Sequence, residues 1–322
     1  GEYEVLTSAY NVRNSAYIRA RRYGQNEYIP AQVKVIDYES NLCLLELDHQ
    51  AMTAPLQPVA FQPDFQQGAE IAFYWLDEDG RIYNGRGYID HARTENSVTS
   101  YAEFLLFVIT NASRPTGRAE LFFLDGQPIG LGCWYKSGSD ESGVIPGEII
   151  SKFLADAADG NYAGFAAAGF EADELLDPTM RNYLKMPADM KSGVYVKEVY
   201  TLGSGCDSLK AQDVILAING VAIDGRGQIR HERYGQIGFL HLITSLTAGQ
   251  PVSFTVWREG QQVQVEAESK AIPAEAMLVP YYEYDRQPEY IVVGGYILQR
   301  LTREYMKAWG EGWSGKVSAH LY

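Results

Sequence analysis

The sequence predicts a mainly β protein with a smaller α+β part, and three observations support this prediction. Short apolar or alternating runs recur through the first half, separated by Gly, Pro or polar clusters. Helical periodicity is scarce before Pro146. The Asn219-Gly220 pair directly follows an apolar run, which is a strong short-range signal for a β-hairpin. With 322 residues, the chain can form about two domains, each with its own core.

Residues 1 to about 150 are expected to form a sandwich or barrel of short strands. Turn signals such as Asp79-Gly80 and Asp125-Gly126 separate the runs at nearly regular intervals. After the last strand, Pro146 can open a helix, because proline is tolerated in the first helical turn. The predicted strands are Tyr3–Leu6, Ala16–Ala20, Ala31–Ile36, Leu42–Leu47, Ile71–Trp75, Gly85–Ile89, Phe104–Ile109 and Leu121–Leu124.

Residues 160–270 are expected to form the α+β part. Asp177-Pro178 predicts the start of a helix, because aspartate is a favourable N-cap and proline fits the first helical position. A second helix is expected from about Ile237 to Leu246. The predicted strands are Val194–Val199, Asp213–Ile218, a return strand from Val221, and a closing hairpin of Gln250–Trp257 and Gln262–Glu268.

The composition excludes several classes of function. A formal net charge of −14 argues against a nucleic-acid or anionic-membrane partner. No apolar run reaches about 18 residues, so we expect no membrane span. The three cysteines, Cys43, Cys133 and Cys206, do not have the spacing of metal ligands, and the five histidines include no HExxH motif. We therefore expect no metal site and no cofactor.

The stretch Ser192–Ile223, with the sequence SGVYVKEVYTLGSGCDSLKAQDVILAINGVAI, resembles the heart of a PDZ domain. It is most similar to the PDZ domains that follow a trypsin-like domain in the Deg/HtrA serine proteases. The alternative is an ordinary hairpin of another α+β domain. Three segments of the first half, Val5–Val12, Ala31–Asp48 and Thr110–Gly130, resemble the regions around the catalytic histidine, aspartate and serine of that family. The similarity points to the plant-type Deg proteases with two PDZ domains and to their bacterial relatives.

The resemblance implies a trypsin-like double β-barrel over 1–155, a PDZ domain over 160–270, and a connector with the start of a second PDZ-like domain over 271–322. The family's strands ahead of the histidine segment are missing here. This implies a fragment, or a first barrel that is incomplete or completed by another polypeptide. We expect Glu289–Leu298 to supply the opening strand and glycine loop of the second PDZ-like domain, and Leu301–Trp309 its first helix. The compartment stays open, with a periplasmic or secreted location favoured.

The three catalytic positions of the family carry other residues in this chain. Tyr10 occupies the histidine position, and a phenol with a pKa near ~10 does not readily accept a proton at neutral pH. Asn41 occupies the aspartate position, and a neutral amide cannot stabilise an imidazolium as a carboxylate does. Ala119 is the best match for the serine, and the stretch Arg114–Tyr135 contains no serine at all. We therefore predict an inactive protease homologue, with an active serine endopeptidase of non-standard site as the alternative.

The resemblance also implies a site for peptides or protein C-termini. Ala168, Gly169 and Phe170 fall where the family has its carboxylate-binding loop, which offers backbone N–H groups to a terminal carboxylate. Leu240 and Ile243 would form the apolar wall opposite. The alternative is a structural subunit whose groove is filled, assembling with copies of itself or with another Deg-like chain.

Overall fold

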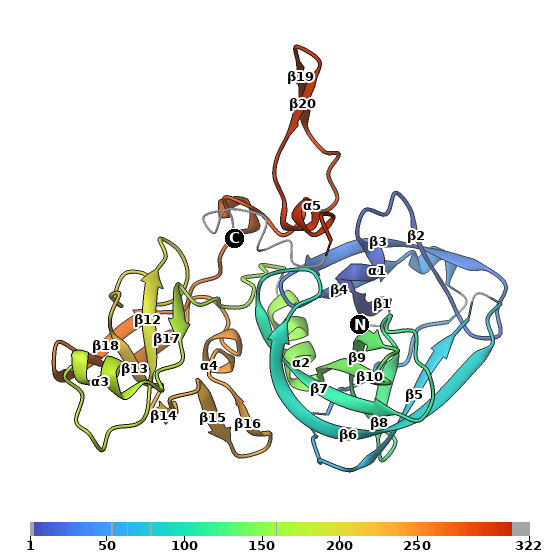
Figure 1. Ribbon diagram of the computed structural model, residues 1–322. Helices are drawn as coiled ribbons and strands as arrows, with labels where there is room; N and C mark the ends of the chain where they lie inside the picture. Colours follow the sequence, from blue (N-terminus) through green and yellow to red (C-terminus); the bar gives the residue numbers. More distant parts are fainter. Residues whose placement is uncertain (1–2, 53, 63, 78, 159, 311–322) are drawn as a thin grey trace.

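The computed structural model describes residues 3–310, apart from residues 53, 63, 78 and 159, and it contains two β-rich halves that lie side by side (Figure 1). The first half contains β1 (Glu4–Ser8), α1 (Ala9–Val12), β2 (Ile18–Arg21), β3 (Tyr28–Asp37), β4 (Leu42–Leu47), a 3-10 helix (His49–Ala51), β5 (Glu70–Leu76), β6 (Ile82–Asn96), β7 (Glu103–Asn111), β8 (Leu121–Leu124), β9 (Gln127–Lys136), β10 (Glu141–Pro146) and α2 (Gly147–Ala157). The second half contains β11 (Phe170–Asp173), α3 (Pro178–Tyr183), β12 (Val194–Val199), β13 (Val214–Ile218), β14 (Val221–Ala222), β15 (Gln228–His231), β16 (Gly235–Gly238), α4 (His241–Thr244), β17 (Pro251–Arg258) and β18 (Gln261–Glu268). A 3-10 helix (Ala274–Ala276), β19 (Tyr290–Val293), β20 (Tyr296–Gln299) and α5 (Arg303–Lys307) follow.

The first half combines an open sheet with a closed barrel. Four antiparallel strands form the sheet in the order β1-β4-β3-β2, and six form the barrel in the order β10-β7-β6-β5-β8-β9. The mainly β prediction is confirmed, and β4 and β8 have the predicted bounds. The sequence does not predict β9, because its two glycines and one proline are poor strand formers. Its burial in the barrel overrides that local preference.

Aromatic side chains fill the barrel interior, and α2 packs against strands of both the barrel and the open sheet. Phe73 and Phe122 stack in the barrel interior with ring centroids 5.0 Å apart. Phe153 of α2 is fully buried in a separate cluster with Leu42 of the open sheet and Phe104 of β7. This cluster joins the open sheet to the barrel.

The second half is built on the antiparallel sheet β11-β12-β13-β17-β18, with β14 paired to β13. Ile215 and Ile218 on β13 are fully buried, as expected for a continuous apolar run of this length. At one end of this sheet, the buried carboxylate of Asp213 accepts two hydrogen bonds from Arg258, both of 2.7 Å. The Asp177 side chain accepts a hydrogen bond of 2.8 Å from Thr179 N–H, so the predicted capped start of α3 is confirmed.

The predicted helix from Ile237 to Leu246 is wrong over most of its length. Strand β16 extends to Gly238, and α4 contains only His241–Thr244. Gly238 explains the difference, because a Cβ atom there would lie 2.2 Å from the Thr94 hydroxyl oxygen on β6. The close approach of β16 to the barrel therefore requires glycine, which is a weak helix former.

The chain beyond the second half returns to the first half. Tyr284 stacks on Tyr38, with ring centroids 3.9 Å apart. Asp285 and Asn14 exchange two hydrogen bonds of 2.7 and 2.8 Å, in which each side chain accepts from the other backbone N–H. These contacts hold the segment against the end of α1.

The segment Glu289–Leu298 forms most of the β19–β20 hairpin, which turns at Gly294-Gly295 and projects from the body (Figure 1). This corrects the expectation of a single opening strand. Its apolar side chains are exposed by between 56% and 76%. The five-residue helix α5 lies within the predicted helix Leu301–Trp309. Among the described residues, no helix has the length and apolar character needed to cross a membrane.

Replacing Ile215 by alanine should lower the free energy of unfolding by about 2–5 kcal/mol, because burial is lost and a cavity remains in the sheet core. Urea titration followed by tryptophan fluorescence would measure this change. Gln262→Ala on the exposed face of β18 is the control and should change the free energy by less than about 0.5 kcal/mol. A loss below about 1 kcal/mol in Ile215→Ala would contradict the burial of β13.

Candidate functional site

The structure brings the three sequence-predicted catalytic positions into one region. The backbone N–H of Tyr10 on α1 donates to the Asn41 side-chain oxygen at 2.9 Å. Asn11 on the same helix donates to the backbone carbonyl of Arg118, at 3.4 Å, beside Ala119. The helix, the β3–β4 turn and the loop before β8 therefore meet as the resemblance implied, although their side chains carry other chemistry.

The Tyr10 side chain is exposed, and its ring is in contact with a cationic side chain. The guanidinium carbon of Arg13 is 3.4 Å from the centre of the Tyr10 ring. A neighbouring cation of this kind stabilises the aromatic face and does not make the phenol a better base.

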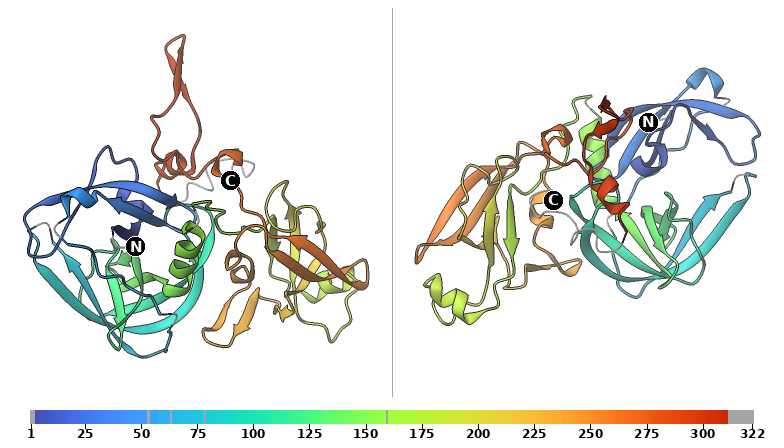
Figure 2. Two further views of the ribbon diagram at one scale, coloured as in Figure 1. Left: turned by 180° about the vertical axis from the view of Figure 1, so that it is seen from behind. Right: turned by 45° about the horizontal axis from the view of Figure 1, so that its top comes forward.

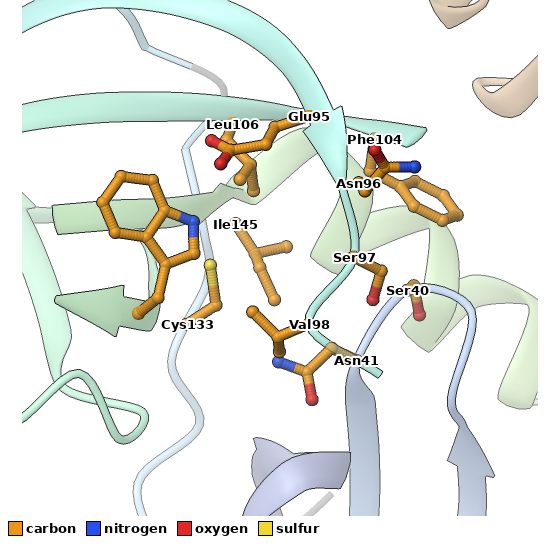
Figure 3. Close-up of a pocket in the computed structure, with 11 residues that line it drawn as sticks. Ser40, Asn41, Glu95, Asn96, Ser97, Val98, Phe104, Leu106, Cys133 and Ile145 are labelled. Atoms are coloured by element: carbon orange, nitrogen blue, oxygen red, sulfur yellow. The ribbon is translucent and has the colours of Figure 1, made fainter. Parts of the chain in front are cut away.

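Asn41 is buried in a left-handed turn conformation, with φ of 59°, which asparagine tolerates better than most residues. Its side chain lines a cavity of about 20 Å³ together with Cys133 and Val98 (Figure 3). The Asn41 amide nitrogen and the Trp134 indole nitrogen, which also line the cavity, have no hydrogen-bond partner among the described residues. A space of this size suits one water molecule and is too small for a substrate side chain.

The loop before β8 is closed by the buried carboxylate of Glu120. One carboxylate oxygen accepts hydrogen bonds from the backbone N–H and the hydroxyl of Thr116. The other accepts from the Arg118 backbone N–H at 2.9 Å. The Ala119 N–H donates to the carbonyl of Gly132, also at 2.9 Å. An oxyanion hole needs free N–H donors aimed at the developing charge, and these three donors already have partners within the protein.

The remaining nucleophile candidates in this stretch are also occupied. The Thr116 hydroxyl donates to Glu120, as above. The Cys133 thiol is buried and donates to the carbonyl of Gly143 at 3.3 Å. Burial raises the pKa of the Cys133 thiol far above its ordinary value, which disfavours the nucleophilic thiolate. Neither group is therefore prepared for covalent catalysis. In the part of the chain that the structure describes, no three potential metal ligands cluster.

A second region lies between the two halves, and Tyr234 anchors it. Tyr234 follows β15 and is buried against Phe65 and Phe107, with ring centroids at 5.6 and 5.8 Å. Its hydroxyl donates to the Glu148 carboxylate on α2 at 2.6 Å. His241 on α4 approaches the other oxygen of Glu148 to 3.7 Å, and burial lowers the pKa of its imidazole to about 4. His241 is therefore a neutral interface residue near pH 7.

Beside this anchor is a groove of about 340 Å³ with walls from both halves. Strand β11 lies at the edge of its sheet and forms one wall. The segments 226–228 and 238–240 also line the groove, and Thr94 of β6 and Glu103 of β7 contribute from the barrel. Two views show the β15–β16 hairpin and α4 between the sheet and the barrel (Figures 1 and 2). An open strand edge beside a groove suits an extended peptide.

Two of the five sequence-predicted groove residues, Phe170 and Leu240, line this groove. The Gly169 N–H instead donates to the carbonyl of Ser204 at 2.8 Å, which corrects the expectation that it faces an incoming carboxylate. The backbone of Gly169 packs directly on Gly203, and a Cβ on either glycine would lie within 2.8 Å of the other's backbone. Ala168 pairs with Ser204 in the same contact.

Ile243 is also misplaced by the sequence prediction, because it is fully buried and is not among the residues that line the groove. The short α4 directs this side chain into the core. The sequence in turn missed Thr94 and Glu103. No local signal could have identified them, because they are distant in the chain from the other groove residues.

The comparisons with known proteins agree with this architecture. A model of the PDZ domain family matches residues 279–322, of which 311–322 lie outside the described residues. The chain is 26% identical to "Protease Do-like 4, mitochondrial" of Arabidopsis thaliana over 94% of its length and 58% of that protein. It is also 26% identical to "Protease Do-like 2, chloroplastic" of the same plant, over 94% of its length and 50% of that protein. The chain is a Deg/HtrA homologue.

The fold of this Deg/HtrA homologue is that of solved HtrA-type structures. The "HtrA-type protease AlgW with decapeptide" superposes with a TM-score of 0.63 at 19% identity, covering 84% of this chain and 80% of the other. The serine endoprotease from Yersinia pestis superposes with a TM-score of 0.53 at 15% identity, covering 84% and 86%. The trypsin-like β-barrel and PDZ fold class is thereby confirmed. The homologue spans about half the length of the curated relatives it matches.

Glu120→Ala should lower the free energy of unfolding by about 1–3 kcal/mol, because it leaves the N–H donors of Thr116 and Arg118 without their acceptor. Thermal and urea unfolding would measure this loss. The control is Glu70→Ala on β5, whose exposed carboxylate pairs with Arg86 at 3.0 Å. That variant should lose about 1 kcal/mol or less. Equal losses in the two variants would show that Glu120 does not hold the loop.

Proposed function

We propose that this Deg/HtrA homologue is a pseudoprotease that binds peptides or protein C-termini through the groove beside β11. Its role would be regulatory or scaffolding, within protein quality control. The proposal has two parts: the nucleophile loop is inactive, and the peptide-binding groove is retained. The two parts rest on separate observations and can be tested separately.

The internal hydrogen bonds of Glu120 are the observation that carries the first part. A tetrahedral intermediate would have to displace a buried carboxylate from the Thr116 and Arg118 amides. If the Glu120 carboxylate stayed in place, it and the oxyanion of the intermediate would compete for the same N–H donors, and their negative charges would repel. This obstacle is independent of Tyr10, Asn41 and Ala119, so restoring the triad side chains would not remove it.

The groove supports the second part. Phe170 and Leu240 supply apolar walls, while β11 leaves one strand edge unpaired for main-chain hydrogen bonds. Arg226 lines the groove and offers a guanidinium to a ligand carboxylate, in place of the Gly169 amide. The solved relatives include AlgW with a decapeptide and with a tripeptide, which agrees with a peptide ligand here.

One observation favours the structural alternative. The Gly169–Gly203 contact closes the loop at 168–170 that would otherwise receive a terminal carboxylate. A subunit that assembles with its own copies or with another Deg-like chain would need no free loop there. Direct binding measurements separate the two proposals, because only a peptide receptor binds short ligands in isolation.

The domain division at 1–155, 160–270 and 271–322 is part of the proposal. The end of α2 at Ala157 and the end of β18 at Glu268 support the first two boundaries to within a few residues. The PDZ family match from residue 279 supports the third part. The named plant relatives are mitochondrial or chloroplastic, and they lend no support to the expectation of a periplasmic or secreted location.

The full chain should hydrolyse neither casein nor small serine-protease substrates, and a fluorophosphonate probe should not label it. The triple variant Tyr10→His, Asn41→Asp, Ala119→Ser should stay inactive as well, because Glu120 still occupies the loop donors. Mass spectrometry of the probe-treated proteins would detect any adduct. Stoichiometric labelling of one serine in the natural chain would overturn the pseudoprotease proposal.

Peptides with a free C-terminal carboxylate and an apolar last residue should bind the full chain, and amidation should weaken them about tenfold or more through loss of a charge-assisted contact. Arg226→Gln should weaken the free-acid peptide by a similar factor and leave the amidated peptide unchanged. Fluorescence anisotropy titration would measure both effects. Complete absence of peptide binding would favour the structural alternative.

A further inference from the structure

We infer that the groove beside β11 selects peptides that carry a lysine or arginine side chain, and that the barrel itself supplies part of this selectivity through Glu103. The inference rests on the proposed peptide-binding function and specifies its ligand class. It is drawn from the distribution of charge around the groove.

The charged side chains that line the groove are mainly acidic. Among its described lining residues, the charged side chains are Glu103, Glu171, Asp173, Glu174 and Arg226, which is four acidic groups against one basic group. Lys197 pairs with Glu171 at 2.8 Å and also lowers the local negative potential near Asp173. Glu103 and Glu174 therefore account for most of the uncompensated negative charge.

Glu103 is the more informative of these two groups. It begins β7 in the barrel, is half-buried, and forms no ion pair within the described part of the chain. Burial raises the pKa of the Glu103 carboxyl, as expected for a desolvated acid without a counter-ion. A cationic ligand group would restore the interaction that this carboxylate lost on leaving water.

Glu174 faces the ligand site from the other half. It follows β11 directly and is exposed at the groove, again without an ion-pair partner among the described residues. Glu103 and Glu174 thus line one groove from different halves of the protein, and a basic side chain bound there would interact with both. A ligand that contacts both walls must contact the barrel as well as the sheet of the second half.

The geometry favours a peptide over a small cation. Strand β11 has one unpaired edge, and main-chain hydrogen bonds to that edge would hold an extended chain in register. Alternate side chains of such a chain then point to the same wall. A basic side chain would supply selectivity, while the apolar contacts at Phe170 and Leu240 are common to all the ligands.

The test uses the full chain and fluorescent decapeptides with a free carboxylate and an apolar last residue. Lysine, norleucine or glutamate is placed in turn at each of the preceding positions. At one or more positions, the lysine peptide should bind about three- to tenfold more tightly than the norleucine peptide at about 50 mM salt, and this advantage should shrink at about 0.5 M salt. The glutamate peptide should bind most weakly.

The variants Glu103→Gln and Glu174→Gln should each reduce the ratio of lysine-peptide to norleucine-peptide affinity about two- to threefold. Glu266→Gln, on the exposed face of β18 at the opposite sheet edge, is the matched control and should change nothing. Circular dichroism would confirm that all variants remain folded.

The outcomes separate this inference from the function on which it rests. Norleucine peptides that bind as tightly as lysine peptides would overturn the basic selectivity while leaving peptide binding intact. A lysine advantage that survives Glu103→Gln would overturn the role of the barrel. Failure of every peptide to bind would overturn both the proposed function and this inference.

Discussion

The hydrogen bond between Tyr234 and Glu148 fixes the geometry on which the groove depends. It joins the second half to helix α2 of the first, at a position where Phe65 and Phe107 exclude water from the Tyr234 ring. A hydrogen bond to a charged acceptor in such surroundings is stronger than the same bond in solvent. Gly238 adds a steric condition, because only glycine permits β16 to lie directly on Thr94. The two walls of the groove belong to different halves, so their separation is set by this contact.

The region of the nucleophile loop brings together the three segments that carry Tyr10, Asn41 and Ala119. Hydrogen bonds between side chains and backbone groups connect these segments. The donors that an active protease would reserve for a transient negative charge are satisfied here by the permanent charge of Glu120. Ala119 keeps a positive φ of 65° in this loop, a conformation that costs a non-glycine residue about 1–2 kcal/mol. The hydrogen bonds to Glu120 help to offset that strain.

If the proposed function holds, the groove and the closed loop at 168–170 bind peptides mainly through side-chain groups. The Gly169 N–H, which could have received a carboxylate, donates to the Ser204 carbonyl beside the tight Gly169–Gly203 contact. In the proposed function, side-chain charge replaces this backbone donor, with Arg226 as the cation and Glu103 and Glu174 as anions that line the groove from different halves. Side-chain electrostatics act over longer distances than hydrogen bonds and depend on salt. Recognition in this groove is therefore expected to be more sensitive to ligand sequence and ionic strength than recognition by backbone amides alone.

The sequence by itself determined several local elements and the absence of serine from the stretch that resembles the nucleophile loop. Short apolar runs placed β4, β8 and β12 at their observed bounds, because apolar side chains favour the buried interior of a sheet. Asp177-Pro178 specified the start of α3 through capping alone. The absence of serine between Arg114 and Tyr135 is a property of the chain and needs no structure.

Tertiary structure alone decided the features that depend on distant contacts. The predicted helix from Ile237 failed because β16 pairs with β15 and packs on the barrel, which no local propensity encodes. Strand β9 formed despite its glycines because closure of the barrel buries it. The places of Glu120 and Glu103 also depend on the folded chain. Glu120 accepts hydrogen bonds from the loop before β8, and Glu103 lines a groove whose other residues are distant in the sequence.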